Sequence, residues 1–172
     1  ATPIILAQAK RIIIERNAFH DPRLREFHDI YLPPPPPRRE IPIYAPSDRI
    51  GIDYVQVNPR AILGIVETNR ADETKPFEPL GDDTRALAEH LVEFLTREMR
   101  AGRLPKPFPP LQSGVGNLAN AALNALGASS QIPRFDMYTE VAQNAVFDLL
   151  AADRVGMVSS CSLTMTPDKL KE

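Results

Sequence analysis

A glycine-flanked turn, Gly114-Val115-Gly116-Asn117, leads into a segment of helical composition. The first amides of a helix have no partner within the helix and lie at the positive end of its dipole, so such a turn can bind an anion. Glycines before a helix also form tight turns that bind nothing. The turn lacks the third glycine of a dinucleotide fingerprint and the Gly-Lys-Ser/Thr ending of a P-loop, so neither nucleotide site is supported.

Glu140 follows the predicted strand Arg134–Thr139, at the carboxyl end where α/β sheets gather their ligands. A glutamate that is ionised at neutral pH can act as a nucleophile without a general base. It is a weak nucleophile, so attack on an acyl carbon would require a preorganised oxyanion hole, which the Gly114–Asn117 turn can provide. The alternative is that Glu140 is only a favourable charge in the first turn of the next helix.

Two segments resemble the signature of the acetyl-CoA hydrolase/transferase family of class I CoA-transferases: residues 111–121, LQSGVGNLANA, and residues 138–141, YTEV. Residues 47–51, SDRIG, and residues 65–69, IVETN, are similar to the segments that precede this signature. The resemblance therefore covers most of the chain in the family's order. One departure follows YTEV, where the family commonly continues with Ile-Gln-Asp-Gly and this chain has AQNA, which lacks the acid and the glycine.

In that family, the glutamate that matches Glu140 attacks the acyl-CoA thioester to form an acyl-glutamyl anhydride. The CoA thiolate returns to give a glutamyl-CoA thioester, and a second carboxylate collects the CoA. The resemblance implies an enzyme that transfers CoA from an acyl-CoA to a small carboxylate of the acetate, succinate or propionate type. Hydrolysis of an acyl-CoA such as acetyl-CoA by the same glutamate is the open alternative.

The same resemblance gives Glu140 and the Val115 amide catalytic roles, the amide as part of the oxyanion hole. The expected substrate-binding residues are Gly114, Gly116, Asn117 and Asn120. The two asparagines suit helix capping and packing equally well. Coenzyme A enters as a substrate, and no cofactor or metal is expected.

A run of five prolines, Pro33–Pro37, precedes Arg38 and matches the P-x-x-P-x-Arg form of a polyproline II ligand. A stiff spacer is the expected explanation, because such runs are common in connections between domains. The alternative from another class of function is therefore a non-catalytic fragment that binds partners through this segment.

Three further residue types have weaker interpretations. His20, His28 and Asp29 are a conceivable metal set, but their spacing matches no ligand pattern, so solvated histidines are expected. Cys161 is either a redox-sensitive thiol close to bound CoA or, as we expect, a small buried hydrophobe beside a strand.

Apolar runs alternate with amphipathic ones along the chain. The predicted strands are Ile12–Ile14, Ala61–Thr68, Arg134–Thr139 and Gly156–Ser160, of which the first two have the continuous apolar pattern of strands covered on both faces. The predicted helices are Asp83–Arg100, Asn117–Leu126, Val141–Ala151 and one opened by Thr166-Pro167. The alternation predicts an α/β fold with a mostly parallel sheet flanked by helices, which the resemblance makes CoA-transferase-like.

The domain organisation expected from these elements has three parts. Residues 1–16 end an N-terminal α/β domain, residues 17–60 form a proline-rich interdomain crossover without sustained periodicity, and residues 61–172 begin a C-terminal CoA-transferase domain with the catalytic glutamate. The family's glycine-rich segment, which completes the oxyanion hole, would lie beyond Glu172. We therefore expect a fragment or processed chain that holds the end of one repeat domain, the start of the next and half a site.

The composition limits the possible partners. The chain has 172 residues with 20 Lys and Arg against 22 Asp and Glu, and this balance lacks the basic surplus of a nucleic-acid-binding protein. The chain contains no run of ~20 apolar residues, which a membrane-spanning helix would need. The single cysteine cannot form an internal disulfide, which favours a cytoplasmic location. A homo-oligomer is plausible from the family alone.

Overall fold

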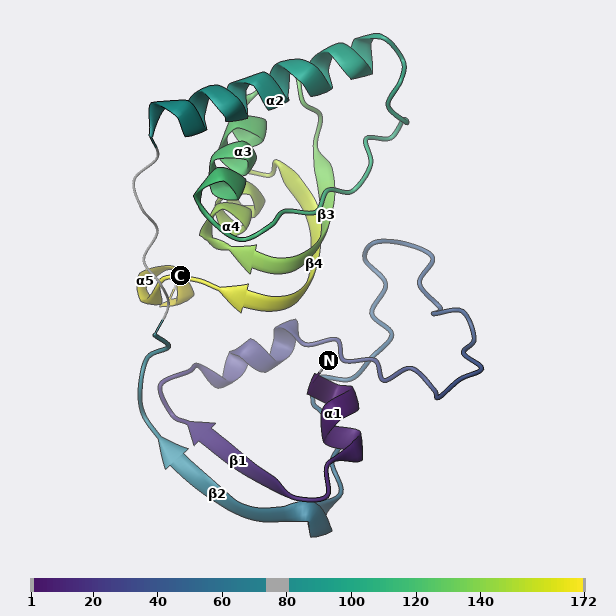
Figure 1. Cartoon of the computed structure of the whole chain (residues 1–172), viewed down its shortest axis with the longest axis vertical. Coiled ribbons are helices and arrows are strands. Elements are labelled where there is room, and N and C mark those ends of the chain that lie inside the picture. Colours follow the sequence, from purple (N-terminus) through teal and green to yellow (C-terminus); the bar gives the residue numbers. More distant parts are fainter. Residues whose placement is uncertain (1, 74–80, 172) are drawn as a thin grey trace. The chain divides into compact units, whose positions relative to one another are not determined.

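The computed structural model of the chain describes residues 2–73 and 81–171. They belong to two compact units, Ala1–Asp72 and Glu73–Glu172. Each unit contains one two-stranded sheet with helices around it (Figure 1). None of the helices within the described ranges is both long and apolar enough to cross a membrane.

The first unit is built on a parallel pair of strands. Its elements are α1 (Thr2–Gln8), β1 (Ile12–Asn17), the 3₁₀ helices η1 (Pro22–Phe27) and η2 (Pro59–Ala61), and β2 (Ile62–Thr68). β1 pairs with β2 so that Ile14 lies opposite Ile65. The two predicted strands are confirmed, but coverage on both faces is not, because Ile13 is 67% and Leu63 63% exposed in this small sheet.

The connection from β1 to β2 starts and ends in the same sheet, whereas the sequence predicts a crossing between two domains. Within this connection, Ile30 and Ile52 form one isolated antiparallel bridge. The Asp29 carboxylate accepts hydrogen bonds from the Ile50 and Gly51 amides at 3.3 and 2.6 Å. Isolated bonds of this kind produce no periodicity in a sequence.

The position of β2 also differs from the expected division of the chain. Residues 61–172 were expected to begin a C-terminal domain, but β2, at the start of this range, belongs to the first compact unit because it pairs with β1. The assignment of the three ranges to the end of one repeat domain and the start of the next stays a prediction.

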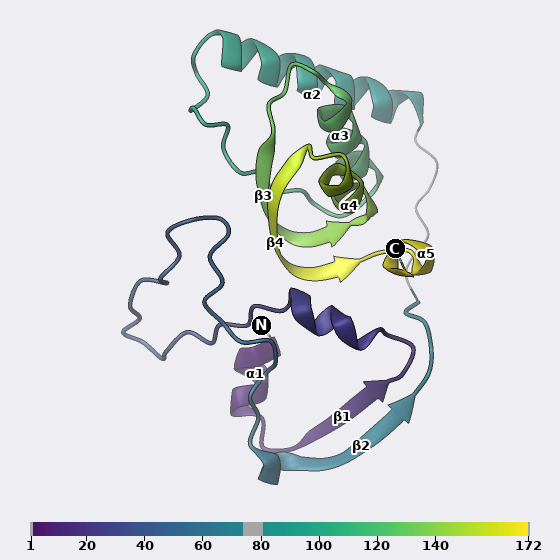
Figure 2. The ribbon, with the colours of Figure 1, turned by 180° about the vertical axis from the view of Figure 1, so that it is seen from behind.

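The second unit places helices on one side of another parallel pair. Its elements are α2 (Asp82–Arg100), α3 (Asn117–Ala128), β3 (Phe135–Gln143), α4 (Asn144–Ala151), β4 (Val155–Thr164) and α5 (Pro167–Lys171). Helix α4 is the crossover that allows β3 and β4 to run parallel, and α3 and α4 lie on the same side of the pair in both views (Figures 1 and 2). The expectation of an α/β fold with parallel strands flanked by helices is confirmed.

The core of the second unit lies between these helices and the inner face of β3. Its centre consists of residues less than 6% exposed from α3, β3, α4, β4 and the loop before β3: Leu123, Leu126, Ile132, Phe135, Met137, Ala142, Ala145, Val146, Leu149 and Val155. Helix α2 covers this cluster with Val92, Leu95 and Met99. Gly127 of α3 leaves room for Leu149 of α4, since an added Cβ would overlap the end of the Leu149 side chain and force it to move.

The end of β3 corrects one sequence prediction that bears on the site. A helix is predicted from Val141, but the strand continues to Gln143, and α4 begins at Asn144. The reason is tertiary: Val141 and Gln143 pair with Ser162 and Thr164 of β4, which itself runs beyond its predicted end. Apolar residues such as Val and Ala fit both states, so pairing decides between them.

Candidate active site

The segment before α3 runs along the free edge of β3. The Leu111 amide donates to the Asp136 carbonyl at 2.9 Å, and the Tyr138 amide donates to the Leu111 carbonyl at 3.0 Å, which makes a parallel bridge to Met137. Since this bridge aligns residue 111 with residue 137, the register brings Gly114 level with Glu140. The structure therefore brings the predicted turn and the predicted nucleophile to the same part of β3.

Thr139 fastens the start of the turn. Its buried hydroxyl donates to the Ser113 carbonyl at 2.9 Å and accepts the Ser113 amide at 3.2 Å. Both polar groups of the Ser113 backbone are satisfied by one side chain, as buried polar groups require.

Gln143 holds the rest of the turn and was missed by the sequence analysis. It is the last residue of β3 and is fully buried, with 0% exposure. Its Nε2 donates to the Gly114 carbonyl at 2.9 Å, and its Oε1 accepts the Gly116 amide at 3.3 Å and the Asn120 Nδ2 at 3.4 Å. Strand alternation could have indicated this role. If β3 is taken to extend to residue 143, alternation places Thr139 and Gln143 on the same face.

The turn itself requires one of its two glycines. Gly116 has φ 123° and ψ 179°, a conformation that is essentially restricted to glycine, and it caps α3. Gly114 has no positive φ. Among the described residues, the Val115 amide has no hydrogen-bond partner, and Val115 is 65% exposed. The amide predicted to serve the oxyanion hole is therefore available.

Glu140 lies on the opposite face of β3 from Thr139 and Gln143, because adjacent residues of a strand alternate. It is exposed, and its carboxylate makes no hydrogen bond or ion pair with the other described residues. Its expected place at a strand–helix junction is wrong, since β3 continues for three more residues. The alternative role as a charge in the first turn of a helix is excluded for the same reason.

Cys161 lies beside Glu140 on the neighbouring strand. Thr139 pairs with Ser160 and Val141 with Ser162, so the intervening residues of β3 and β4 are level and share a face. The expectation of a small buried hydrophobe is wrong, because Cys161 is exposed, as its neighbour Glu140 is.

The two asparagines of α3 have different surroundings. Asn117 occupies the first position of the helix, as expected. Asn120 donates to Gln143, while its Oδ1 is buried without a partner among the described residues. Asn120 therefore supports the turn through Gln143, and the role of either residue in binding substrate stays a prediction.

The conceivable metal set does not assemble. His20 pairs with Asp72, with Nε2 and Oδ1 3.2 Å apart, and His28 Nδ1 lies 3.2 Å from the Asp53 carbonyl. Asp29 instead binds backbone amides. Within the described ranges, no cluster of three metal-ligating side chains occurs. Most of the polyproline run is exposed, and its role as a ligand stays a prediction.

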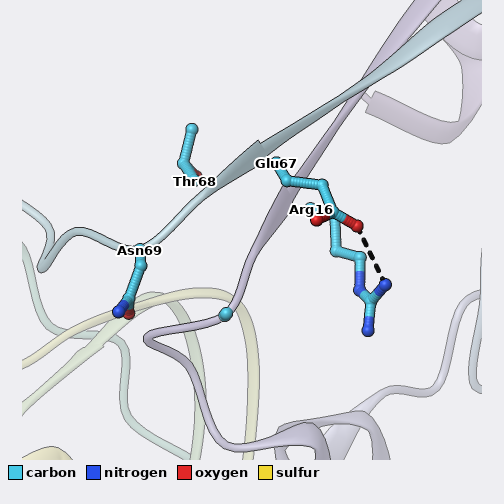
Figure 3. A pocket seen from close by; sticks show the side chains of 5 residues that line it. Arg16, Glu67, Thr68 and Asn69 are labelled. Carbon is cyan, nitrogen blue, oxygen red and sulfur yellow. Dashed lines mark hydrogen bonds and ion pairs between the residues drawn. The ribbon is translucent and has the colours of Figure 1, made fainter.

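An open pocket of about 340 Å³ lies at the carboxyl ends of β1 and β2 (Figure 3). It is lined in part by Arg16, Glu67 and Asn69, and Arg16 pairs with Glu67 across 3.1 Å. Both charged side chains are more than 70% exposed, so the pair is screened by solvent and holds no unsatisfied buried charge that would point to a ligand.

The second unit therefore has an exposed carboxylate on a parallel strand, level with a glycine-dependent turn that has a free amide. A carboxylate can act as a nucleophile, and a free amide can donate a hydrogen bond to a developing oxyanion. The fold agrees with that of the solved structure of a RipA mutant, with a TM-score of 0.61 at 17% identity over 99% of this chain and 32% of the RipA chain. No family model matches the chain.

The chain is similar to curated CoA transferases and acetyl-CoA hydrolases. The chain is 43% identical over 171 residues to the propanoyl-CoA:succinate CoA transferase of Escherichia coli, covering 99% of this chain and 35% of the relative. It is 38% identical to the acetyl-CoA hydrolase of Schizosaccharomyces pombe and 37% identical to the succinyl-CoA:acetate CoA-transferase of Clostridium kluyveri, each over at least 97% of this chain and 32% of the relative. The chain spans about a third of the length of these relatives. It is homologous to that part of the acetyl-CoA hydrolases and CoA transferases, which confirms the resemblance seen in its motifs.

Proposed function

We propose that the protein is an enzyme that transfers CoA from an acyl-CoA to a small carboxylate through a thioester on Glu140. The observation that carries the proposal is the alignment of the exposed Glu140 with the turn that holds the free Val115 amide. The relatives whose names include CoA transfer support the substrate class.

The proposed reaction begins with attack of the Glu140 carboxylate on the thioester carbonyl carbon. Negative charge develops on the carbonyl oxygen, where the Val115 N–H can donate a hydrogen bond. Collapse expels the CoA thiolate and leaves an acyl-glutamyl anhydride. The thiolate then attacks the glutamyl carbonyl, releases the acyl group as a carboxylate and forms the glutamyl-CoA thioester. An acceptor carboxylate reverses both steps, so no metal or prosthetic group is required.

Hydrolysis is the second candidate, because several relatives are named acetyl-CoA hydrolase and because Glu140 is exposed to solvent. Water would replace the acceptor carboxylate in the second half of the reaction. The two activities differ in their products: transfer requires the acceptor and yields a new acyl-CoA, whereas hydrolysis yields free CoA without it.

The proposed partners are therefore an acyl-CoA and a small carboxylate. A cytoplasmic location is part of the proposal and is supported by the single cysteine, which has no internal disulfide partner. A homo-oligomer is expected from the family alone.

The test compares substitutions on one face of β3 in the longest form of the protein that turns over an acyl-CoA. Glu140→Gln removes the nucleophile and should abolish transfer while helical content is retained. Asp136→Asn is the matched control, because Asp136 precedes Glu140 by four residues on the same face. Near-normal transfer by the Glu140→Gln variant would refute the proposal.

A further inference from the structure

We propose that Gln143 is a positioning residue that directs the Val115 N–H outward for the acyl-transfer step. The inference rests on the proposed function. It concerns a residue that does not touch substrate but controls the orientation of two successive peptide units in the turn.

The first peptide unit joins Gly114 to Val115. Its carbonyl oxygen accepts a hydrogen bond from Gln143 Nε2 at 2.9 Å and therefore points toward the buried carboxamide. The C=O and N–H of a trans peptide point in opposite directions, and this bond is trans. The Val115 N–H consequently points away from Gln143, and it has no partner among the described residues.

The second peptide unit joins Val115 to Gly116 and has the reverse orientation. Its N–H donates to Gln143 Oε1 at 3.3 Å, so this amide is occupied and is not available to a substrate. The Gln143 carboxamide thus binds both units and leaves the Val115 amide as the free donor. The Ser113 hydroxyl also donates to the Gly114 carbonyl, at 3.2 Å, but it does not reach the second unit. The bond to the Gly114 carbonyl also polarises the peptide that carries this amide, which strengthens it as a donor.

The orientation of the carboxamide is itself determined by its partners. A flipped carboxamide would place its NH₂ group against the Gly116 amide and its oxygen against the Gly114 carbonyl, which would oppose like groups at both contacts. The Asn120 Nδ2, 3.4 Å from Oε1, adds a further donor to the same oxygen. Complete burial of Gln143 removes water as an alternative partner.

Two substitutions separate positioning from packing. Gln143→Met retains the approximate volume but loses the donor and the acceptor. Gln143→Glu retains the acceptor, yet when ionised it cannot donate to the Gly114 carbonyl. When protonated, the introduced carboxyl regains one donor and one acceptor, and burial raises the pKa of a carboxyl group.

The experiment measures kcat and KM for CoA transfer in the longest active form, with folding checked by circular dichroism. We expect Gln143→Met to lower kcat about 10- to 100-fold while KM changes less than about 3-fold, because the interaction matters mainly in the transition state. Relative to the unsubstituted protein, Gln143→Glu should recover kcat as pH falls, whereas Gln143→Met should not.

Unchanged kcat in a folded Gln143→Met variant would overturn the positioning role. So would a kcat of the Gln143→Glu variant that keeps the same ratio to that of the unsubstituted protein at all pH values. If Gln143→Met does not fold, the pH dependence of the Gln143→Glu variant decides alone. Failure of the proposed function is distinguished by Glu140→Gln: if this variant retains transfer, the proposed function fails, and the positioning role with it. If Glu140→Gln loses transfer and Gln143→Met keeps it, only the positioning role fails.

Discussion

Replacement of Gly116 by alanine is expected to strain the turn that precedes α3. An added Cβ would meet no atom within 4 Å, so the cost comes from the backbone conformation alone. A non-glycine residue at φ 123° and ψ 179° costs about 1–3 kcal/mol. Alanine also reduces the entropy of the unfolded chain, which offsets about 0.4–1 kcal/mol. The expected net loss is about 1–2 kcal/mol in the free energy of unfolding.

The assay is thermal unfolding of the second unit, monitored through the helical signal in its circular dichroism spectrum. For a unit of roughly 100 residues, this loss lowers Tm by about 4–15 °C. Gly114→Ala is the matched control, because an added Cβ at Gly114 would also meet open space, but the residue has no positive φ. It should change the free energy of unfolding by less than about 0.5 kcal/mol. Equal Tm values for the two variants would refute the requirement for glycine at position 116.

Three further predictions concern other described contacts. Thr139→Val should lower the free energy of unfolding by about 1–3 kcal/mol in urea denaturation, because it leaves a buried loop amide unsatisfied, and Thr139→Ser should cost less. Hydrogen bonds with Arg23 lower the pKa of Asp21 from 3.8 to about 2. The contribution of this pair to the stability of the folded chain is therefore present above pH 3.8 and lost as the pH falls through about 2. NMR titration of the Asp21 carboxyl should show a midpoint near pH 2, and the Arg23→Gln substitution should raise this midpoint. Alkylation of Cys161 by iodoacetamide should block transfer at the adjacent Glu140, whereas Cys161→Ser should remain active and resistant.

The sequence predicts the elements whose pattern is local. The helix at residues 82–100 was expected from residue 83 because its apolar spacing and its acidic start are visible in the chain. The helix that begins at Asn117 was expected because a glycine turn precedes it. The chemistry of the turn and the nucleophilic carboxylate could be inferred from residue types, together with the family's motifs.

The remaining features depend on tertiary pairing. The strand nature of residues 141–143 follows from pairing with β4, which no local pattern specifies. Exposure of Cys161 follows from its place on β4, level with the exposed Glu140 of β3, which no local pattern specifies. The role of Gln143 could not be predicted either, because its three partners are 23 to 29 residues away in the chain. Its burial became visible only after the end of β3 was placed.

Peptide mass spectrometry tests the central claim, the covalent role of Glu140, most directly. The longest active form would be incubated with acetyl-CoA or succinyl-CoA without an acceptor and digested with trypsin, which releases Glu140 in the peptide 135–154. We expect a CoA adduct on this peptide, located at Glu140 by fragmentation and absent from the Glu140→Gln variant. A chain that turns over acyl-CoA but carries no adduct there, or carries it on another carboxylate, would contradict the glutamyl mechanism.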